Sequence, residues 1–527
     1  MAKNERNLYA QELDLPRMHS PKSPYVRPLL FLCLVASPLL LGACKTTPSS
    51  HSVLVRDFLI WPAQRYENTA KTIPPGTVGS CPNGRLVLLT GQTRPGEIVV
   101  RDLYDGSGSV DSTSASTSMP YPIDATVEKL ATDNQIVRMK NGNLLAVKNG
   151  YTWQDNIIHK SWWNAFTPAS NWSPGSRNSI YLWYSSNCGN TWQRITRIDP
   201  AQQYGGRYAW PQPTGNNDVF GAPIYGIGGY DRTEAYTCPF TGTIYISSHG
   251  DGGPFPDGQT TRSYHKLVFF YSTNNGSSWD EMGEIDDGAP AVMTSTPNGR
   301  FYAFSASGGV PKLYYTMVPG DPTTFTGKSE VWYNESPGND SQRAVPAVDK
   351  DVSIFRNIHQ IAISRISTDA NSSKVRIAYN ALNGFGRQVY KILSAEILDG
   401  DPASGAVVHW SKTISSSDPS GRSLVYGAFI DPDYVDMPSG TTSNRSVFYY
   451  IDASSDDAPF SYYAADYVFF YNSLNFATDP EVLSTWTTPV TPGDYFTGGF
   501  YWKDGKEHYV PQWREPDGIH AAVIRGD

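Results

Sequence analysis

The stretch Tyr184–Trp192, YSSNCGNTW, occurs a second time in the chain as Tyr271–Trp279, YSTNNGSSW. Both copies fit the pattern S-x-N-x-G-x-[TS]-W, and each follows an apolar run typical of a strand, IYLWYS or LVFFYS. In such a pattern asparagine caps a tight turn through its side chain, and glycine supplies the backbone freedom that the turn needs. The repeat therefore predicts two equivalent turns, each joining two strands.

The composition is that of many short strands joined by turns. The chain has 527 residues with 46 Gly, 39 Pro and 33 Tyr, which is enough for one large all-β domain. Its formal net charge is −8, and only 17% of its residues are charged. This balance disfavours binding driven by bulk electrostatics, so we expect no nucleic-acid partner, and we expect a monomer.

A second repeat consists of a turn followed by an alternating β-rich run, as in CPNGRLVLLT or TPNGRFYAF. Seven such turns occur, centred on Gly84, Gly142, Gly242, Gly299, Ser372, Asn444 and Gly505. Their spacing fits units of four strands, which is typical of propeller blades. The sequence predicts an all-β, seven-bladed β-propeller with four-stranded antiparallel blades. The alternative is a six-bladed propeller, in which the first and last units complete one shared blade.

The S-x-N-x-G-x-[TS]-W motif resembles the Asp-box, or bacterial neuraminidase repeat, of sialidase-like β-propellers. Asn187 and Asn274 stand where that family usually has aspartate. The resemblance implies that the motif lies between outer strands, on the face away from the ligand site. It does not choose among sialidases, related exo-glycosidases, polysaccharide lyases and non-catalytic lectins, because the motif is part of the scaffold.

The N-terminus has the features of a targeting segment. Lys22 and Arg27 precede an apolar run over residues 28–44, which is too short for a comfortable membrane span. Within it, Leu41-Gly42-Ala43-Cys44 resembles the bacterial lipobox, which implies cleavage before Cys44 and lipidation of that cysteine.

The predicted organisation follows from the lipobox. We expect membrane attachment through the lipid, in the outer membrane on its periplasmic or cell-surface side. The expected parts are a signal peptide with an N-terminal extension (1–43), a lipid anchor with a leash (44–70) and a single propeller domain (71–527).

Cys33 would be removed with the signal peptide, so three cysteines remain besides the lipidation site, Cys81, Cys188 and Cys238. They allow one disulfide and one free thiol without fixing the pairing. No cysteine or histidine spacing fits a zinc site, so we expect no cofactor. An alternative is a divalent cation held by three oxygen- and nitrogen-bearing side chains of the segment HGDGGPFPDG, namely His249, Asp251 and Asp257.

Candidate catalytic residues fall in the predicted loops of the face opposite the Asp-box, within residues 150–178, 225–236 and 249–265. Elimination from a uronic-acid glycan needs a cation to neutralise the carboxylate and a base such as histidine or tyrosine. The candidates of these types are His159, His249, His265, Tyr264, Tyr230, Arg232 and Arg262. The ordinary alternative for each histidine is a solvent-exposed or structural role.

The sequence favours a polysaccharide lyase, of the ulvan-lyase-like type, over a hydrolase. The early Arg-Ile-Pro motif of sialidases is absent, and the nearest stretch, Thr93–Glu97, follows a predicted strand instead of preceding one. The alternatives are an exo-α-sialidase or related glycoside hydrolase, and a non-catalytic glycan-binding propeller. In each case the expected partner is an anionic polysaccharide. Trp153, Trp162 and Trp163 are candidates for stacking on sugar rings, or they pin their loop to the domain.

Overall fold

The protein divides into two compact units, Met1–Ser49 and Ser50–Asp527. The computed structural model describes residues of the second unit only, and in part of its strands only the backbone. The described ranges are 57–61, 68–72, 85–90, 97–102, 116–118, 128–152, 178–198, 213–217, 223–225, 229–252, 264–285, 291–305, 312–330, 361–365, 372–398, 406–416, 418–431, 447–453, 465–472, 481–490, 498–503, 506–515, 518–522 and 524–526. The expected signal peptide and Cys44 lie outside them.

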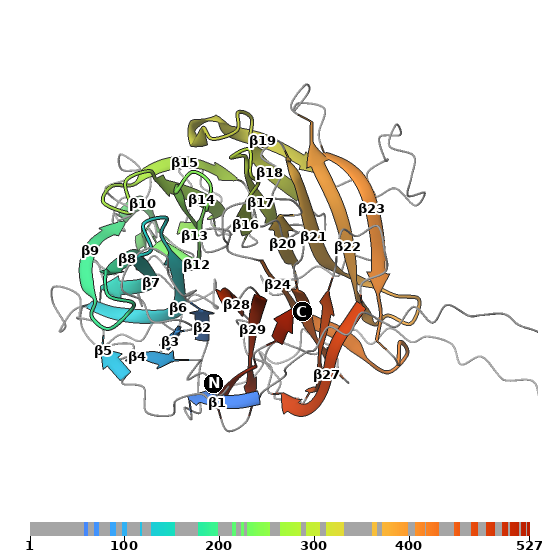
Figure 1. The fold of residues 1–527 in the computed structure, drawn as a ribbon. Helices are drawn as coiled ribbons and strands as arrows, with labels where there is room; N and C mark the ends of the chain where they lie inside the picture. Colours follow the sequence, from blue (N-terminus) through green and yellow to red (C-terminus); the bar gives the residue numbers. More distant parts are fainter. Residues whose placement is uncertain are drawn as a thin grey trace, which may run out of the picture. The chain divides into compact units, whose positions relative to one another are not determined.

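Six four-stranded antiparallel sheets account for most of the described residues, and each consists of consecutive strands in chain order (Figure 1). This confirms the predicted all-β class and the four-stranded antiparallel unit. The first three sheets are β2 (Asn68–Thr72), β3 (Arg85–Thr90), β4 (Glu97–Asp102), β5 (Ser116–Ser118); β6 (Glu128–Arg138), β7 (Leu144–Thr152), β8 (Asn178–Ser185), β9 (Gln193–Ile198); and β12 (Gly229–Thr237), β13 (Ile244–Gly252), β14 (Tyr264–Ser272), β15 (Asp280–Ile285).

The other three repeat this order, and the turn β18–β19 contains a short 3-10 helix, η3 (Pro322–Thr324). They are β16 (Val292–Ser295), β17 (Phe301–Ser305), β18 (Lys312–Thr316), β19 (Phe325–Glu330); β20 (Ile361–Arg365), β21 (Lys374–Leu382), β22 (Gln388–Ile397), β23 (Ala406–Ile414); and β24 (Ser423–Ile430), β25 (Val447–Ala453), β26 (Ala465–Asn472), β27 (Glu481–Val490). In the described ranges, no helix is long and apolar enough to cross a membrane.

The last sheet contains both ends of the folded chain. It has the order β1-β30-β29-β28, with β31 paired to β29, and its strands are β1 (Asp57–Trp61), β28 (Gly498–Lys503), β29 (Lys506–Glu515), β30 (Gly518–Ala522) and β31 (Ile524–Gly526). A separate hairpin pairs β10 (Pro213–Asn217) with β11 (Pro223–Tyr225). Because Asp57 pairs with Ala522, β1 belongs to a sheet although it falls within the predicted leash of residues 44–70. The folded part of the chain therefore begins within the segment that was expected to be the leash.

With β28 taken as the first strand of the last sheet, the seven predicted turns all lie between the first and second strands of a sheet. Three of the central glycines have a left-handed backbone conformation, with φ of 84° at Gly142, 81° at Gly242 and 88° at Gly299. Glycine adopts this region without steric cost, which explains its place in these turns. The first strands of successive sheets contact one another in chain order from β2 through β6, β12, β16, β20 and β24 to β28, and β28 in turn contacts β2.

The first copy of the repeated motif forms the turn between β8 and β9, from the third to the fourth strand of its sheet. Asn187 Oδ1 accepts hydrogen bonds from the Ser185 hydroxyl (3.1 Å) and the Thr191 amide (2.9 Å), while its Nδ2 donates to Thr191 Oγ1 (2.8 Å). The Gly189 amide donates to Ser185 Oγ (2.9 Å), and Trp192 Nε1 donates to the Gly189 carbonyl (2.9 Å). Asparagine therefore caps the turn as predicted, and it adds a donor that aspartate lacks.

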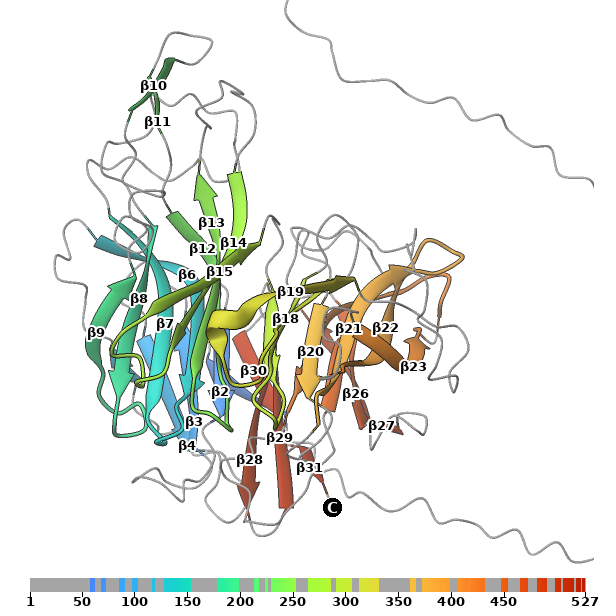
Figure 2. The ribbon, with the colours of Figure 1, turned by 90° about the horizontal axis from the view of Figure 1, so that it is seen from above.

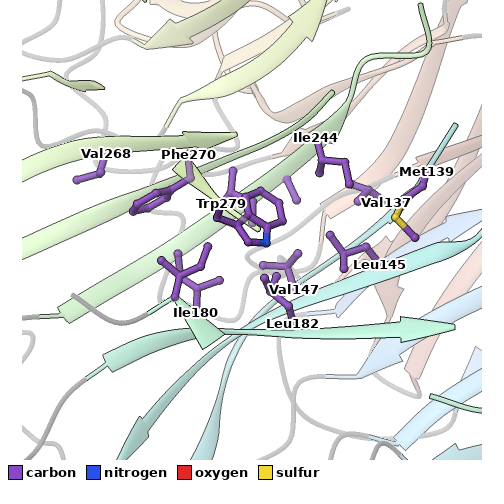
Figure 3. Packing of buried hydrophobic residues seen from close by; sticks show 13 residues of the cluster. Val137, Met139, Leu145, Val147, Ile180, Leu182, Ile244, Val268, Phe270 and Trp279 are labelled. Carbon is purple, nitrogen blue, oxygen red and sulfur yellow. The ribbon is translucent and has the colours of Figure 1, made fainter. Parts of the chain in front are cut away.

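The second copy repeats this network between β14 and β15. Asn274 Oδ1 accepts from the Ser272 hydroxyl and the Ser278 amide, both at 2.9 Å, and Trp279 Nε1 donates to the Gly276 carbonyl at 3.0 Å. Figure 3 shows the Trp279 ring within an apolar cluster that spans two sheets. Its other members include Val137, Leu145, Val147, Ile180, Leu182, Ile244, Val268 and Phe270. Trp279 thus anchors the turn of one sheet against the neighbouring sheet.

The cysteines take different states. Cys188, inside the first Asp-box, is disulfide-bonded, whereas Cys238 is a buried free thiol. Cys238 directly follows β12 and packs with Tyr245 and Phe301. Its burial inside an apolar cluster fits a structural role, and the partner of Cys188 lies outside the described residues.

A buried polar cluster joins the carboxyl ends of four first strands; we call it the Arg365 cluster. It comprises Tyr236 near the end of β12, Ser295 at the end of β16, Arg365 at the end of β20 with its neighbour Ser364, and Asp431 directly after β24. Tyr236 Oη lies 2.9 Å from Ser295 Oγ and accepts from the Ser295 amide (3.0 Å) and from Arg365 Nη1 (3.3 Å). The Ser364 hydroxyl and the Arg365 amide (3.4 Å) donate to the Asp431 carboxylate.

This convergence fixes the direction of the strands. Because the carboxyl ends of β12, β16, β20 and β24 meet, the four strands run the same way, and their sheets share two ends. We call the end with the first-to-second and third-to-fourth connections the turn end, and the end with the second-to-third connections the loop end. The Lys140 ammonium, in the β6–β7 turn, donates to the Phe240 carbonyl in the β12–β13 turn (2.9 Å), which places the sheet β6–β9 in the same orientation.

The electrostatics of the cluster depend on Arg365, which is buried. Burial raises the pKa of the Asp431 carboxyl, and the positive charge of Arg365 is the strongest influence in the opposite direction. Burial also raises the pKa of Tyr236 to about 12, so this hydroxyl stays protonated and bonded near neutral pH. The guanidinium further lies 5.6 Å from the centre of the Phe240 ring, within the range of a cation–π interaction.

We expect Arg365→Met to lower the free energy of unfolding by about 3 kcal/mol at about pH 8, because it leaves the Asp431 carboxylate without its compensating charge. The pKa of Asp431 is already raised, and removing Arg365 raises it further. Protonation removes the unfavourable charge, so the loss should shrink toward about pH 5. Urea unfolding at both pH values measures the effect. In the control Arg365→Met/Asp431→Asn the pH dependence should disappear; a loss that is equal at both pH values in the single variant would contradict the prediction.

Candidate active site

Five of the seven predicted catalytic residues lie on adjacent strands of one sheet, β12–β15 (Figure 2). Tyr230 and Arg232 are on β12, His249 is on β13, and Tyr264 and His265 are on β14. The structure describes the backbone of these residues, so their relation is given by strand register. His159, Arg262, Trp153, Trp162, Trp163 and Asp257 lie outside the described residues.

The register places these residues close together. His249 pairs with Asp231 of β12, and two residues further along β13 Asp251 pairs with His265 of β14. Tyr264 is the first residue of β14 and pairs with Gly252. Directly opposed residues on paired strands lie about 5 Å apart. By strand alternation His249, Asp251 and His265 share one face of the loop end of this sheet, and Tyr264 falls on the other face.

The Asp-box lies at the opposite end of the same strand. β14 begins at Tyr264 and ends at Ser272, where the second Asp-box starts. At about 3.3 Å per residue, the strand separates the two by about 26 Å. Tyr264 and His265 therefore lie at the end of β14 opposite the Asp-box.

A bulge interrupts β12 at the candidate site. The register with β13 shifts between Asp231 and Glu234, so Arg232 lies in the bulge. Thr233, in the same bulged segment, and Ser248 of β13 are both buried, and their hydroxyls lie 3.0 Å apart and share a hydrogen bond. Bulges bend a strand and re-aim side chains, and they are over-represented next to active sites.

The first strands of two other sheets, β6 and β24, also carry a bulge, and neither bulge was predicted from the sequence. β6 shifts register between Leu130 and Asn134, and β24 between Val425 and Ala428. The bulged segments contain Asp133 and Tyr426, while β2, β16, β20 and β28 pair with their second strands without a shift. The sequence signal is weak: in KLATDNQIV, polar residues break the alternation expected of a strand.

The β24 bulge is held by close packing. The Gly427 amide donates to the Tyr390 hydroxyl, and a Cβ at Gly427 would lie 2.6 Å from ring atoms of both Tyr390 and Phe448. Any larger residue would push these rings apart, so glycine is required here by space and not by its backbone angles. The segment next to Tyr426 is therefore positioned by a buried aromatic wall.

The alternative metal site gains no support from the part of the chain that the structure describes. Within it, no group of three or more His, Cys, Asp or Glu side chains is arranged to hold a metal ion. His249 and Asp251 lie on β13, but Asp257 falls outside the described residues.

No protein-family model and no curated protein matches the chain. Among solved structures, a variant of the NanB sialidase from Streptococcus pneumoniae is 8% identical over 84% of this chain and 83% of its own, with a TM-score of 0.39. A Trypanosoma rangeli sialidase mutant displaying trans-sialidase activity is 12% identical over 88% and 60%, with a TM-score of 0.36. The Hadza microbial sialidase Hz136 is 12% identical over 84% and 73%, with a TM-score of 0.37. Similarity at this level decides neither the fold nor the reaction.

The two ends of β14 provide a matched pair of variants. We expect Tyr264→Phe to lower kcat/KM on an acidic glycan by about 100-fold, because a hydroxyl that transfers or stabilises a proton in the reaction contributes that much. Tyr271→Phe, which removes a hydroxyl beside the Asp-box on the same strand, should leave kcat/KM unchanged. Both variants should unfold at the wild-type temperature. Equal activity of the two would contradict the placement of the site at the loop end.

Proposed function

We propose that this protein is a glycan-degrading enzyme that acts on sugars bearing a carboxylate. The observation that carries the proposal is the grouping of His249, His265, Tyr264, Tyr230 and Arg232 at the loop end of the sheet β12–β15. An arginine forms bidentate, charge-assisted hydrogen bonds with a carboxylate, which suits Arg232 to orient an acidic sugar. Histidine and tyrosine supply groups that exchange protons with the glycosidic oxygen or the sugar ring.

Hydrolysis is the reaction that we place first. It requires an acid that protonates the leaving oxygen, together with a nucleophile or a base that activates water, and sialidases use tyrosine as the nucleophile. Two carboxyl-bearing residues are register partners of the histidines: Asp231 pairs with His249, and Asp251 pairs with His265. The bulge of β6, a strand that contacts β12, contains a further carboxyl-bearing residue, Asp133. This supply of carboxyl groups supports an acidic-sugar glycoside hydrolase of the exo-α-sialidase type.

Elimination is the second candidate, and the pair of histidines favours it. Histidine titrates near neutral pH, so a neutral imidazole can remove the proton next to the sugar carboxylate while arginine neutralises that carboxylate. The bond to the leaving oxygen then breaks as an acid such as a tyrosine hydroxyl gives that oxygen a proton, a double bond forms in the sugar ring, and no water is consumed. The lyase favoured by the sequence therefore takes second place, because its residue types serve hydrolysis equally well. A non-catalytic glycan-binding propeller is the third alternative.

The products distinguish the three alternatives. The folded protein is incubated separately with sialylated glycoprotein, polygalacturonate and ulvan, and the products are analysed by mass spectrometry and ultraviolet absorbance. Hydrolysis should release a free acidic sugar, with the mass of one water added for each bond cleaved. An unsaturated product that absorbs in the ultraviolet would assign the lyase reaction instead. Binding of a glycan without any product would contradict both enzymatic proposals.

For the scaffold of the site, we propose one seven-bladed β-propeller. The circuit of contacts among the first strands, closed by β28 on β2, supports this arrangement. A six-bladed alternative needs the first and last units to share a blade, whereas β2–β5 and the sheet containing β1 and β28–β31 are separate. An experimental structure with six sheets around the axis would contradict it.

We also propose that the protein is an exported lipoprotein of the bacterial cell envelope, on the basis of the sequence Leu41–Cys44. Lipidation of Cys44 would place the enzyme where extracellular glycans reach it. The measurement is metabolic labelling of the full chain with radioactive palmitate. Label should be incorporated into the wild type and lost in Cys44→Ala, and equal labelling of both would contradict the proposal.

A further inference from the structure

A single aromatic side chain stands exposed at the loop end of a different sheet. Among the described residues, the large hydrophobic side chains on the surface are Val318, Leu382, Phe385 and Leu398, and Phe385 is the most exposed at 68%. Phe385 lies in the turn between β21 and β22, the second and third strands of their sheet. Since β20 and β12 run in the same direction, this turn lies at the same end as Tyr264 and His265.

The turn that carries Phe385 is held rigidly. Asn383 Oδ1 accepts from the amides of Phe385 and Arg387, both at 2.9 Å, and the Gly386 amide donates to the Asn383 carbonyl at 2.9 Å. Gly386 has φ of 73°, so the turn needs glycine at this position. These bonds fix the backbone on both sides of the phenylalanine, and its exposure is therefore a property of a well-formed turn.

The turn is also tied to the neighbouring connection between β23 and β24. Asn383 Nδ2 donates to the Pro419 carbonyl (2.7 Å), and Arg387 Nε donates to the Ser420 carbonyl (3.1 Å). This connection continues into Arg422, whose Nε donates to the Asp452 carboxylate at 3.0 Å. Phe385 is thus supported by two sheets, which lowers the entropy cost of binding a ligand against it.

The two residues that flank Phe385, Gly384 and Gly386, are surrounded by open space. A Cβ built at Gly384 or Gly386 would meet no heavy atom within 4 Å. The positively charged Arg387 lies two positions further along the turn. A rigid aromatic face with open flanks and a nearby cation matches a sugar ring that has an apolar C–H face and an acidic substituent.

We propose that Phe385 is a sugar-stacking subsite for the acidic glycan, separate from the residues that cleave it. The subsite holds a ring of the polymer away from the scissile bond, so it matters for long substrates and not for short ones. The proposal rests on the proposed glycan-degrading function, which it deepens by adding a binding position outside the sheet β12–β15.

The test compares Phe385→Ala, Phe385→Trp and the control Val318→Ala in the full chain. Val318 is an exposed apolar residue in the β18–β19 turn, at the turn end, so its removal should change nothing. We expect Phe385→Ala to raise KM for the polymer by about 5- to 10-fold with kcat unchanged, and to leave the shortest cleavable substrate unaffected. Phe385→Trp should restore the wild-type KM because it restores an aromatic face.

Affinity electrophoresis separates failure of the subsite from failure of the proposed function. Native gels that contain polygalacturonate, ulvan or sialylated mucin report retention without requiring turnover. Retention of the wild type that is reduced in Phe385→Ala supports the subsite even if no glycan is cleaved, in which case only the proposed function fails. Wild-type retention by none of the three gels, equal retention of Phe385→Ala, or an equal loss of activity on long and short substrates would overturn the subsite.

Discussion

The contact on which the rest of the structure depends is that of the buried Arg365 guanidinium with Tyr236. It joins the end of β20 to the end of β12, and Ser295 and Asp431 extend the same network to β16 and β24. A buried charge is tolerated only where hydrogen bonds and opposite charge compensate its desolvation. The network therefore requires four carboxyl ends to meet in one place, and this requirement gives four sheets a common direction.

Because the sheets share a direction, different kinds of residues collect at their two ends. The turn end holds the Arg365 cluster, whose side chains bond mainly to one another, and the two Asp-box turns, whose asparagines bond to the backbone of their own turn. At the loop end, the register gathers histidine, tyrosine, arginine and aspartate, and three first strands depart from regular pairing there or just below.

Local patterns allowed much of this fold to be predicted. The Asn-x-Gly turn chemistry identified both Asp-boxes, and the turn residues from Gly84 to Gly505 located the first hairpin of every sheet, because both signals lie within a few adjacent residues. Long-range pairing was less accessible. The pairing of β1 with β30 joins residues from opposite ends of the sequence, so residues 57–61 were assigned to a leash.

The candidate site was likewise harder to predict where it depends on strand pairing. Tyr264 and His265 could be selected as candidates because they precede a motif of known orientation, although the structure places them on β14 and not in a loop. Asp133 and Tyr426 were not selected, because a bulge is a property of two strands in register. Phe385 was missed because an aromatic residue in a strand-rich sequence is expected to be buried. The sequence-based preference for elimination over hydrolysis did not come from the candidate site, since both reactions use the same residue types and differ in geometry.

The central claim is that the glycan binds at the loop end of the sheet β12–β15, away from the Asp-boxes. Hydrogen–deuterium exchange of the wild-type protein, with and without a saturating amount of the acidic sugar that the proposed hydrolysis would release, tests this claim most directly. We predict that the sugar slows exchange in peptides from residues 229–233, 248–252 and 264–267, with no change over 185–192 and 272–279. Protection of the Asp-box peptides without protection of the loop-end peptides would contradict the claim.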